Sequence, residues 1–220
     1  MNLLHTVRPL FFLLAAGLVL SLSACDDGNP VEPEPIELDV QTVENLAADP
    51  ATRIGPRGPE GTGKYTFFSL RDNEVVLSYA ASSRADSAST AWDIALQGTT
   101  LRVNGGVSGP GEGAAYVAEA ALEEVAEVEA SQFQTDTDGA LAIPTGSGNG
   151  WYNYNANGNN LIRPIPGRTL VVRTADGDGY AKIRIVSYYE GAPDDPAASN
   201  AEGRHYTFDY VYQPDGTRFE

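Results

Sequence analysis

TLVVRTADGDGYAKIRIVSYY, residues 169–189, contains two β-prone runs around a turn of Asp and Gly. This pattern predicts an antiparallel β-hairpin. In the second run, Ala181, Ile183 and Ile185 alternate with Lys182 and Arg184. Because successive side chains of a strand point to opposite faces of the sheet, we expect one buried face and one face in water.

Similar runs occur elsewhere in the chain. Residues 65–70 and 74–79 form one pair of β-prone runs separated by turn residues, and residues 92–96 and 100–103 form another. Both pairs predict hairpins. Residues 205–212 place aromatic side chains at every second position, which is typical of core packing; they are Tyr206, Phe208, Tyr210 and Tyr212. The sequence therefore predicts several β-hairpins in the domain that begins at residue 64.

One segment, residues 114–130, has a different pattern. It is rich in Ala and Glu, and its apolar residues have near-helical spacing, as in Val117, Ala121, Val125 and Val128. By propensity alone this segment is a helix.

The first 24 residues predict a signal peptide. Arg8 precedes the apolar run 10–20, which has the length of a signal-peptide core and is too short for an ordinary spanning helix. The following Leu22-Ser23-Ala24-Cys25 resembles the lipobox of bacterial lipoproteins, which implies cleavage before Cys25 and lipidation of its thiol and new amine. Two or more acyl chains on one residue would anchor the protein durably, whereas one chain binds a bilayer marginally. A plain secreted protein with an unmodified cysteine is the alternative.

Residues 25–63 predict a disordered tether that is acidic and rich in Pro and Gly. Acidic residues directly after a lipidated cysteine resemble a surface-export signal of Bacteroidota-like lipoproteins, although Asp at that position resembles an inner-membrane retention signal in some other bacteria. Within the tether, residues 55–63 form three collagen-like triplets. Three triplets are too few for a triple helix, so we expect a loop there.

Charge and composition exclude several classes of function. The chain has 30 acidic and 14 basic residues. Loss of residues 1–24 removes only Arg8, which leaves a net charge of −17 and a field that repels nucleic acid. Cys25 is the only cysteine, so no intrachain disulfide can form. The mature chain has one histidine, His205, and no Ser-His-Asp set is recognisable. We therefore predict that the protein is not an enzyme.

Four loop segments contain residues that could contact a ligand. Asp136 with Asp138, and the turn 176–178, lack the full spacing of a calcium loop, and turn chemistry explains them better. The glycine-rich stretch 104–113 is not followed by the Lys of a phosphate loop, so we expect a long loop with positive φ at several glycines. The stretch 151–160, WYNYNANGNN, could cover a flat ligand or could be a packed loop.

Together, several blocks in this order resemble the HmuY family of haem-binding bacterial lipoproteins. The resemblance runs from Tyr65 to the C-terminus and rests on residues 89–96, 101–109, 151–154, 164–168, 180–189 and 206–210. It implies an all-β, many-stranded antiparallel domain over residues 64–220, with long, finger-like loops that can close on haem. It also implies β structure near residues 114–130, so we expect strand or extended chain there instead of the helix.

The resemblance further implies that haem or a related porphyrin is bound for iron acquisition and passed to an outer-membrane haem transporter. The protein would be exported and lipid-anchored at the outer membrane or cell surface. The family holds iron with two histidines, and relatives use methionine. Here His205 stands alone and Met1 leaves with the signal peptide, so those ligand pairs are excluded. A tyrosinate is another known iron ligand, and Tyr152 and Tyr154 are the candidates. A non-haem surface binding or structural lipoprotein on the same scaffold is the rival hypothesis.

Overall fold

The computed structural model describes residues 38–56, 58–81, 87–155 and 159–219. These described residues belong to one compact unit. The predicted signal peptide, the lipidation site Cys25 and the first part of the predicted tether lie outside the described residues. Within the described ranges, no helix is both long enough and apolar enough to cross a membrane.

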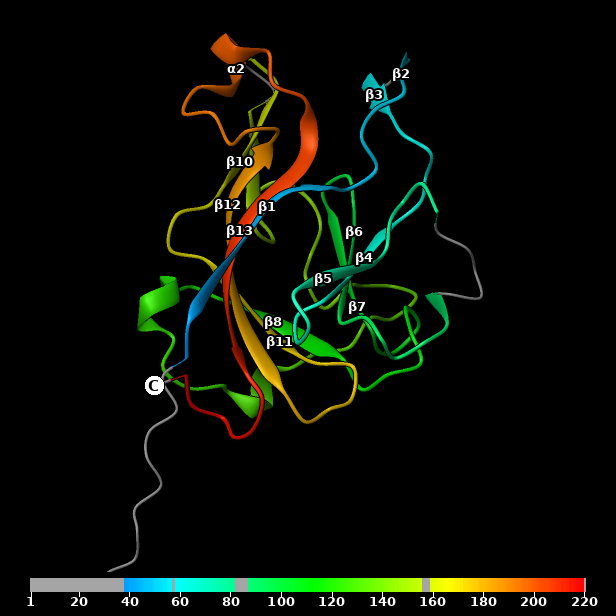
Figure 1. Cartoon of the computed structure of the whole chain (residues 1–220). Helices are drawn as coiled ribbons and strands as arrows, with labels where there is room; N and C mark the ends of the chain where they lie inside the picture. Colours follow the sequence, from blue (N-terminus) through cyan, green and yellow to red (C-terminus); the bar gives the residue numbers. More distant parts are fainter. Residues whose placement is uncertain (1–37, 57, 82–86, 156–158, 220) are drawn as a thin grey trace, which may run out of the picture. The chain divides into compact units, whose positions relative to one another are not determined.

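The larger sheet has five antiparallel strands in the order β1-β13-β12-β11-β8 (Figure 1). The predicted hairpin of residues 169–189 is confirmed: Leu170 pairs with Ile183, and Arg173 with Tyr180. The strands of this sheet are β1 (Val40–Ala47), β8 (Ala114–Ala118), β11 (Thr169–Arg173), β12 (Tyr180–Tyr189) and β13 (Gly203–Gln213).

A second sheet has four antiparallel strands in the order β5-β4-β6-β7. Its two hairpins are those predicted from residues 65–79 and 92–103. The strands are β4 (Thr66–Ser69), β5 (Glu74–Leu77), β6 (Ile94–Gln97) and β7 (Thr100–Val103). The all-β, antiparallel fold class is thereby confirmed.

Two separate hairpins and three short helices complete the described structure. The hairpins are β2 (Arg53–Gly55) with β3 (Gly58–Glu60), and β9 (Tyr152–Asn155) with β10 (Leu161–Pro164). The helices are the 3₁₀ turns η1 (Leu122–Glu124) and η2 (Ala130–Gln132) and the single turn α2 (Pro196–Ser199).

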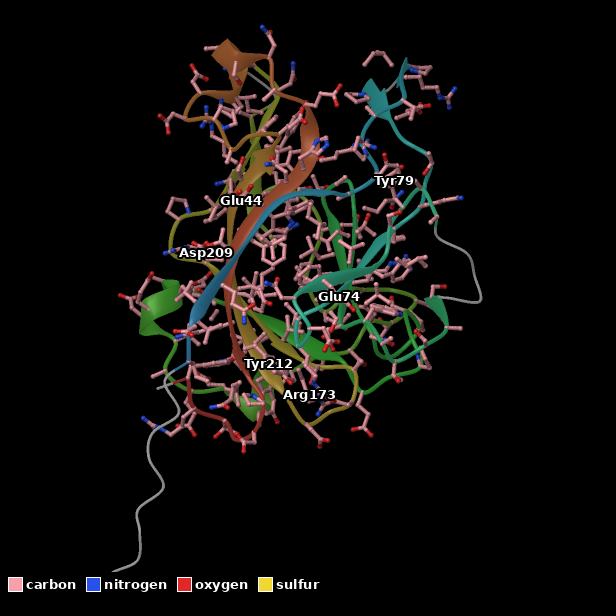
Figure 2. The ribbon with its side chains drawn as sticks, in the orientation of Figure 1. Glu44, Glu74, Tyr79, Arg173, Asp209 and Tyr212 are labelled. Carbon is pink, nitrogen blue, oxygen red and sulfur yellow. The ribbon has the colours of Figure 1, made fainter. Side chains whose placement is uncertain are left out.

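The core lies where side chains of the two larger sheets meet, and Figure 2 shows them filling the space between the ribbons. The aromatic alternation of residues 205–212 supplies its centre, because Tyr206, Phe208 and Tyr210 are fully buried. Phe68 on β4 meets Phe208 edge to face, with ring centroids 5.7 Å apart. Such pairs stabilise a core beyond the area they bury.

A buried carboxylate also connects the two sheets. Asp93 accepts an N–H bond from Leu70 at 2.8 Å and another from Ala175 at 2.8 Å. Leu70 follows β4, whereas Ala175 follows β11. Burial raises the pKa of Asp93, and these two bonds and the nearby Arg71 oppose that rise.

The predicted tether over residues 25–63 is wrong from residue 40 onward, because β1 pairs with β13 along its length. Val43 and Leu46 both pack toward the core although they are three residues apart. A bulge with Asn45 at φ +54° separates them and breaks the period-2 pattern that marks a strand. The collagen-like segment is likewise not a plain loop, since it contains part of the β2–β3 hairpin.

The helix favoured by propensity for residues 114–130 is absent, and the expectation of strand or extended chain is confirmed. β8 pairs with β11 from Ala114 opposite Arg173 to Ala118 opposite Thr169. Short 3₁₀ turns and extended chain follow. Packing of Tyr116 and Val125 into a second hydrophobic cluster outweighs the weak helical preference of Ala and Glu.

The prediction of a wet face on β12 is wrong at Lys182, which the second cluster covers, whereas the side chain of Arg184 on the same face is 42 % exposed. Lys182 is only 6 % exposed. Its Nζ donates to the carbonyl of Val125 at 2.9 Å and lies over the ring of Phe219. Val125, which follows η1, and Phe219, near the C-terminus, thus cover a position that the alternation predicted to be solvated.

The glycines of residues 104–113 are required mainly by close approach, and Gly106 alone among them has positive φ. A Cβ on Gly105 would lie 1.9 Å from the carbonyl oxygen of Gly113. Asn104 holds the loop together, because its amide donates to the carbonyl of Trp92 and accepts from the N–H of Gly111. The expectation of several positive φ angles is therefore wrong for this loop.

Candidate functional site

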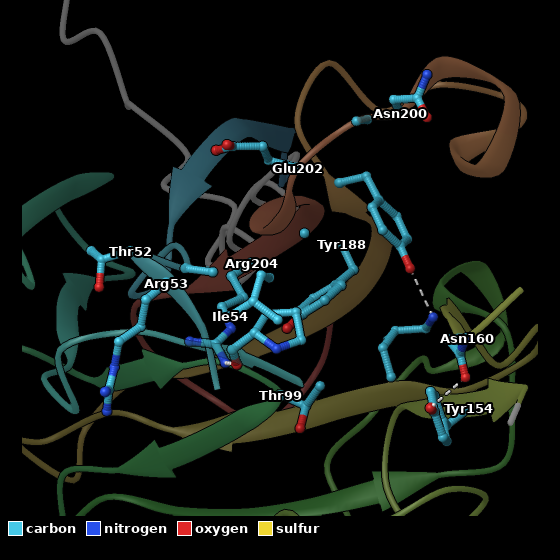
Figure 3. Close-up of a pocket in the computed structure, with 17 residues that line it drawn as sticks. Thr52, Arg53, Ile54, Thr99, Tyr154, Asn160, Tyr188, Asn200, Glu202 and Arg204 are labelled. Carbon is cyan, nitrogen blue, oxygen red and sulfur yellow. Dashed lines mark hydrogen bonds between the residues drawn. The ribbon is translucent and has the colours of Figure 1, made fainter. Parts of the chain in front are cut away.

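A cavity of about 740 Å³ lies at one end of the five-stranded sheet (Figure 3). Its walls come from the β2–β3 hairpin, the β9–β10 hairpin and the connection between β12 and β13, and the β6–β7 turn contributes Gly98 and Thr99. Such a volume is typical of sites for small molecules and cofactors. The lining combines aromatic and aliphatic side chains with two arginines and one acid, namely Tyr154, Tyr188, Tyr189, Ile54, Ile162, Arg53, Arg204 and Glu202.

Arg204 and Asp49 fix the β2–β3 wall. Arg204 donates to the carbonyl oxygens of Asp49 at 2.9 Å and Pro59 at 2.7 Å. The Asp49 carboxylate accepts N–H bonds from Thr62 and Gly63 and a hydroxyl bond from Thr62, at 2.7–2.8 Å. Burial by itself raises the pKa of Asp49, but these hydrogen bonds outweigh it, so the pKa lies below the usual value for Asp.

The floor of the cavity is a packed aromatic cluster. Tyr188 meets Tyr189 and Tyr206 edge to face, each at 5.5 Å between ring centroids, and Trp151 lies 5.9 Å away. The Tyr206 hydroxyl donates to the carbonyl of Gly98 at 2.8 Å. Burial raises the pKa of Tyr188, which the nearby Arg204 only partly counters. These phenols therefore stay protonated at neutral pH.

The rim is more exposed. Tyr154 is 43 % exposed and donates its hydroxyl to the side-chain oxygen of Asn160 at 2.9 Å, as drawn in Figure 3. Ile54 is 79 % exposed, and Arg53 beside it pairs with Glu60. This rim offers a flat aromatic surface and an aliphatic surface at the mouth of the cavity.

A second cavity of about 280 Å³ lies on the same hairpin. Tyr154 lines this space as well, together with Asn153 and Arg163. Tyr154 therefore contributes to both cavities.

A protein-family model, described as HmuY protein, matches residues 62–210. The chain belongs to the HmuY family. The match covers the four-stranded sheet, the β9–β10 finger and the five-stranded sheet except β1, and it ends within β13. No curated protein sequence matches the chain.

Three solved structures resemble this HmuY-family chain at low identity. The apo HmuY analog of Tannerella forsythia has 16 % identity and a TM-score of 0.45, covering 81 % of this chain and 96 % of its own. A protein from Bacteroides fragilis described as a lipoprotein has 16 % identity and a TM-score of 0.45, with coverages of 80 % and 90 %. A protein from Bacteroides vulgatus described as an HmuY-like heme-binding protein has 14 % identity and a TM-score of 0.42, with coverages of 80 % and 92 %.

The two tyrosines predicted as iron ligands occupy different environments. Both lie on β9, but Tyr152 is buried in the main core and its hydroxyl accepts from Thr99 at 3.3 Å. Tyr152 lines neither cavity, whereas Tyr154 lines both. Residues 151–160 could either cover a flat ligand or form a packed loop, and the structure shows part of each. Trp151 and Tyr152 pack inward, whereas Tyr154 lies at the rim of the cavity.

Tyr188 and Arg204 are cavity residues that sequence reasoning missed. The Tyr-Tyr end of the 180–189 run was visible, but nothing local indicated that it forms a cavity floor. His205 next to Arg204 does not line the cavity, and its Nδ1 lies 3.2 Å from the carbonyl of Gly203. Among the described residues, no group of three or more His, Cys, Asp or Glu side chains could hold a metal ion.

Proposed function

We propose that this HmuY-family chain is a lipid-anchored binding protein that takes up haem or a related porphyrin in the main cavity. The observation that carries the proposal is the aromatic and aliphatic cavity between the hairpins of a HmuY-family fold. Tyr188 and Tyr189 at the floor, with Tyr154 at the rim, supply surfaces suited to a flat apolar ring. Bound haem would supply iron and its redox chemistry, and the chain's own residues would stack on and orient the ring.

Tyr154 is the residue proposed to hold the iron, because it lines the cavity and is accessible, whereas Tyr152 is packed in the core. Its hydroxyl already has a hydrogen-bond acceptor in Asn160, which fixes the direction of the phenol. A tyrosinate is an established iron ligand in haem proteins.

The strand geometry agrees with an anchor on Cys25. β1 starts at Val40, which pairs with Val211, and ends at Ala47, which pairs with His205. The cavity residues 51–54 come shortly after Ala47, and the cavity residues 203–204 come directly before His205. The eight residues of β1 span roughly 25 Å, so the described chain starts at the end of the sheet remote from the cavity. A lipid tether at that end would leave the cavity free for ligand and for delivery to an outer-membrane transporter.

Hemin titration of the purified full chain tests the ligand. We expect a shifted Soret band that saturates at micromolar hemin, and an unshifted, non-saturating absorbance would refute haem binding and favour the non-haem hypothesis. Tyr154→Phe should alter the band, and an unchanged spectrum would reject Tyr154 as the ligand. Tyr180→Phe is the matched control, because Tyr180 lies at the other end of β12, opposite Gln213.

The anchor is tested separately in cells. Cys25→Ser should move the protein from the membrane fraction to the soluble fraction, and mass spectrometry of the wild-type N-terminus should find acyl chains on Cys25. Membrane retention of the Cys25→Ser protein would contradict lipid anchoring at this residue.

A further inference from the structure

The cavity floor brings a phenol and a guanidinium together. Tyr188 and Arg204 both line the cavity, and Figure 3 shows Tyr188 extending toward Arg204. Tyr188 is only 7 % exposed. Hydrogen bonds and charges act more strongly in such a desolvated place than at the surface. A polar group of a ligand that reached this floor would therefore bind more strongly than it would at the surface.

Arg204 is held in place but keeps its charge available. Two of its five N–H donors bond to neutral carbonyl oxygens, those of Asp49 and Pro59, and Arg204 also hydrogen-bonds the phenol oxygen of Tyr188. The Asp49 carboxylate lies 4.0 Å from Nη1 and already accepts three other hydrogen bonds. Arg204 also has φ +67°, a left-handed conformation that is costly for a residue with a side chain and that gathers at ligand sites.

Tyr188 is suited to donate a hydrogen bond. Its burial raises the pKa of the phenol and outweighs the opposite effect of Arg204, so the proton stays on the oxygen at neutral pH. A neutral phenol beside a permanent cation is a donor pair for an anion, and arginine matches the planar geometry of a carboxylate. The same pKa shift makes Tyr188 a poor source of a tyrosinate.

The charge distribution favours an anion at this floor. The whole chain has a net charge of −16, which repels acidic ligands. The described residues that line the cavity include two arginines, Arg53 and Arg204, and one acid, Glu202. Arg53 forms a close ion pair with Glu60, whereas Arg204 lies 4.0 Å from the Asp49 carboxylate, so the charge of Arg204 is the less closely compensated of the two.

We propose that Tyr188 and Arg204 bind a carboxylate of the ligand, so that a porphyrin enters the cavity with a propionate directed at the floor. This inference rests on the proposed function, and it specifies which end of the ligand the protein recognises. The apolar ring would then lie against Ile54 and Ile162, which line the same cavity.

The test compares metal-free protoporphyrin IX with its dimethyl ester on the full chain, with porphyrin fluorescence as the readout. The free acid should bind about tenfold or more tightly than the ester, because a hydrogen bond to a charged group is lost in the ester. Tyr188→Phe should weaken binding of the acid by about tenfold and leave ester binding unchanged. Tyr180→Phe should bind both like the wild type, and a thermal melt of each variant checks folding.

Each outcome is decisive. Equal binding of acid and ester by the wild type would overturn the inference while haem binding stands. A Tyr188→Phe variant that binds protoporphyrin normally but alters the hemin spectrum would make Tyr188 an iron ligand and also overturn it. Failure of every porphyrin to bind would refute the proposed function, and the inference would fall with it.

Discussion

Replacing Asp49 with Asn should destabilise the protein in a pH-dependent way. The carboxylate accepts three hydrogen bonds, two from Thr62 and one from Gly63, and lies 4.0 Å from Arg204. Asn is the suitable replacement because Asp49 has φ +59°, a conformation that Asn tolerates. The change therefore removes the charge and one acceptor position without adding backbone strain.

The size of the effect follows from these contacts. A hydrogen bond to a charged group contributes about 1.5–3 kcal/mol. The amide oxygen of Asn can still accept, whereas its NH₂ group would face an N–H donor. Thr62 is exposed and can turn to water, so the three contributions do not add. We expect a loss of about 2 kcal/mol in the free energy of unfolding at pH 7, or about 4–8 °C in Tm.

The pH dependence gives a second check. The pKa of Asp49 is lowered in the folded state, so its contribution is present above the unfolded pKa and is lost as the pH falls through the folded value. The difference between wild type and Asp49→Asn should be full at pH 7 and smaller at pH 3, which is below the unfolded pKa. Both conditions avoid the isoelectric region near pH 4.4.

Urea unfolding of the full chain at both pH values measures this difference. Glu44→Gln is the matched control, because Glu44 is an exposed carboxylate on the same strand-to-loop segment (Figure 2). A loss of equal size at pH 3 and pH 7, or a loss no larger than that of Glu44→Gln, would refute the reasoning.

Three further changes test the core and the cavity wall. Tyr206→Phe leaves the carbonyl of Gly98 without its buried donor, and should cost about 1–3 kcal/mol in urea unfolding. Phe68→Ala opens the space between the sheets and should cost about 3–5 kcal/mol, against a near-neutral Val75→Ala at an exposed position of β5. Gly61→Ala places a Cβ 2.4 Å from a carboxylate oxygen of Asp49, so both Tm and porphyrin affinity should fall; wild-type values in both assays would disprove the close packing.

Much of the fold could be predicted because the alternation of apolar and polar residues along a strand indicates which side chains are buried. The hairpin of residues 169–189 and the aromatic alternation of residues 205–212 both needed only the period-2 rule. β1 could not be found in this way, because the bulge at Asn45 shifts its register. Lys182 was misassigned because the segment that covers it is far along the chain from β12.

The candidate site divides in the same manner. The local run of aromatic residues at 151–154 was enough to predict Tyr154 as a candidate. That run does not indicate which ligand it would contact. The floor combines the turn at Gly98, the end of β12 at Tyr188 and the start of β13 at Arg204. These residues are brought together only when β6, β12 and β13 pack.

The sequence by itself determined the acidic charge, the main antiparallel hairpins and the prediction of a lipidated Cys25, because composition, alternation and short motifs are properties of neighbouring residues. Tertiary structure alone decided that residue 40 already belongs to the sheet, that Lys182 is buried, and that Tyr188 and Arg204 meet at the floor of a cavity. Those features depend on contacts between segments distant in sequence, and no local pattern of side chains specifies which distant segment will pack against it.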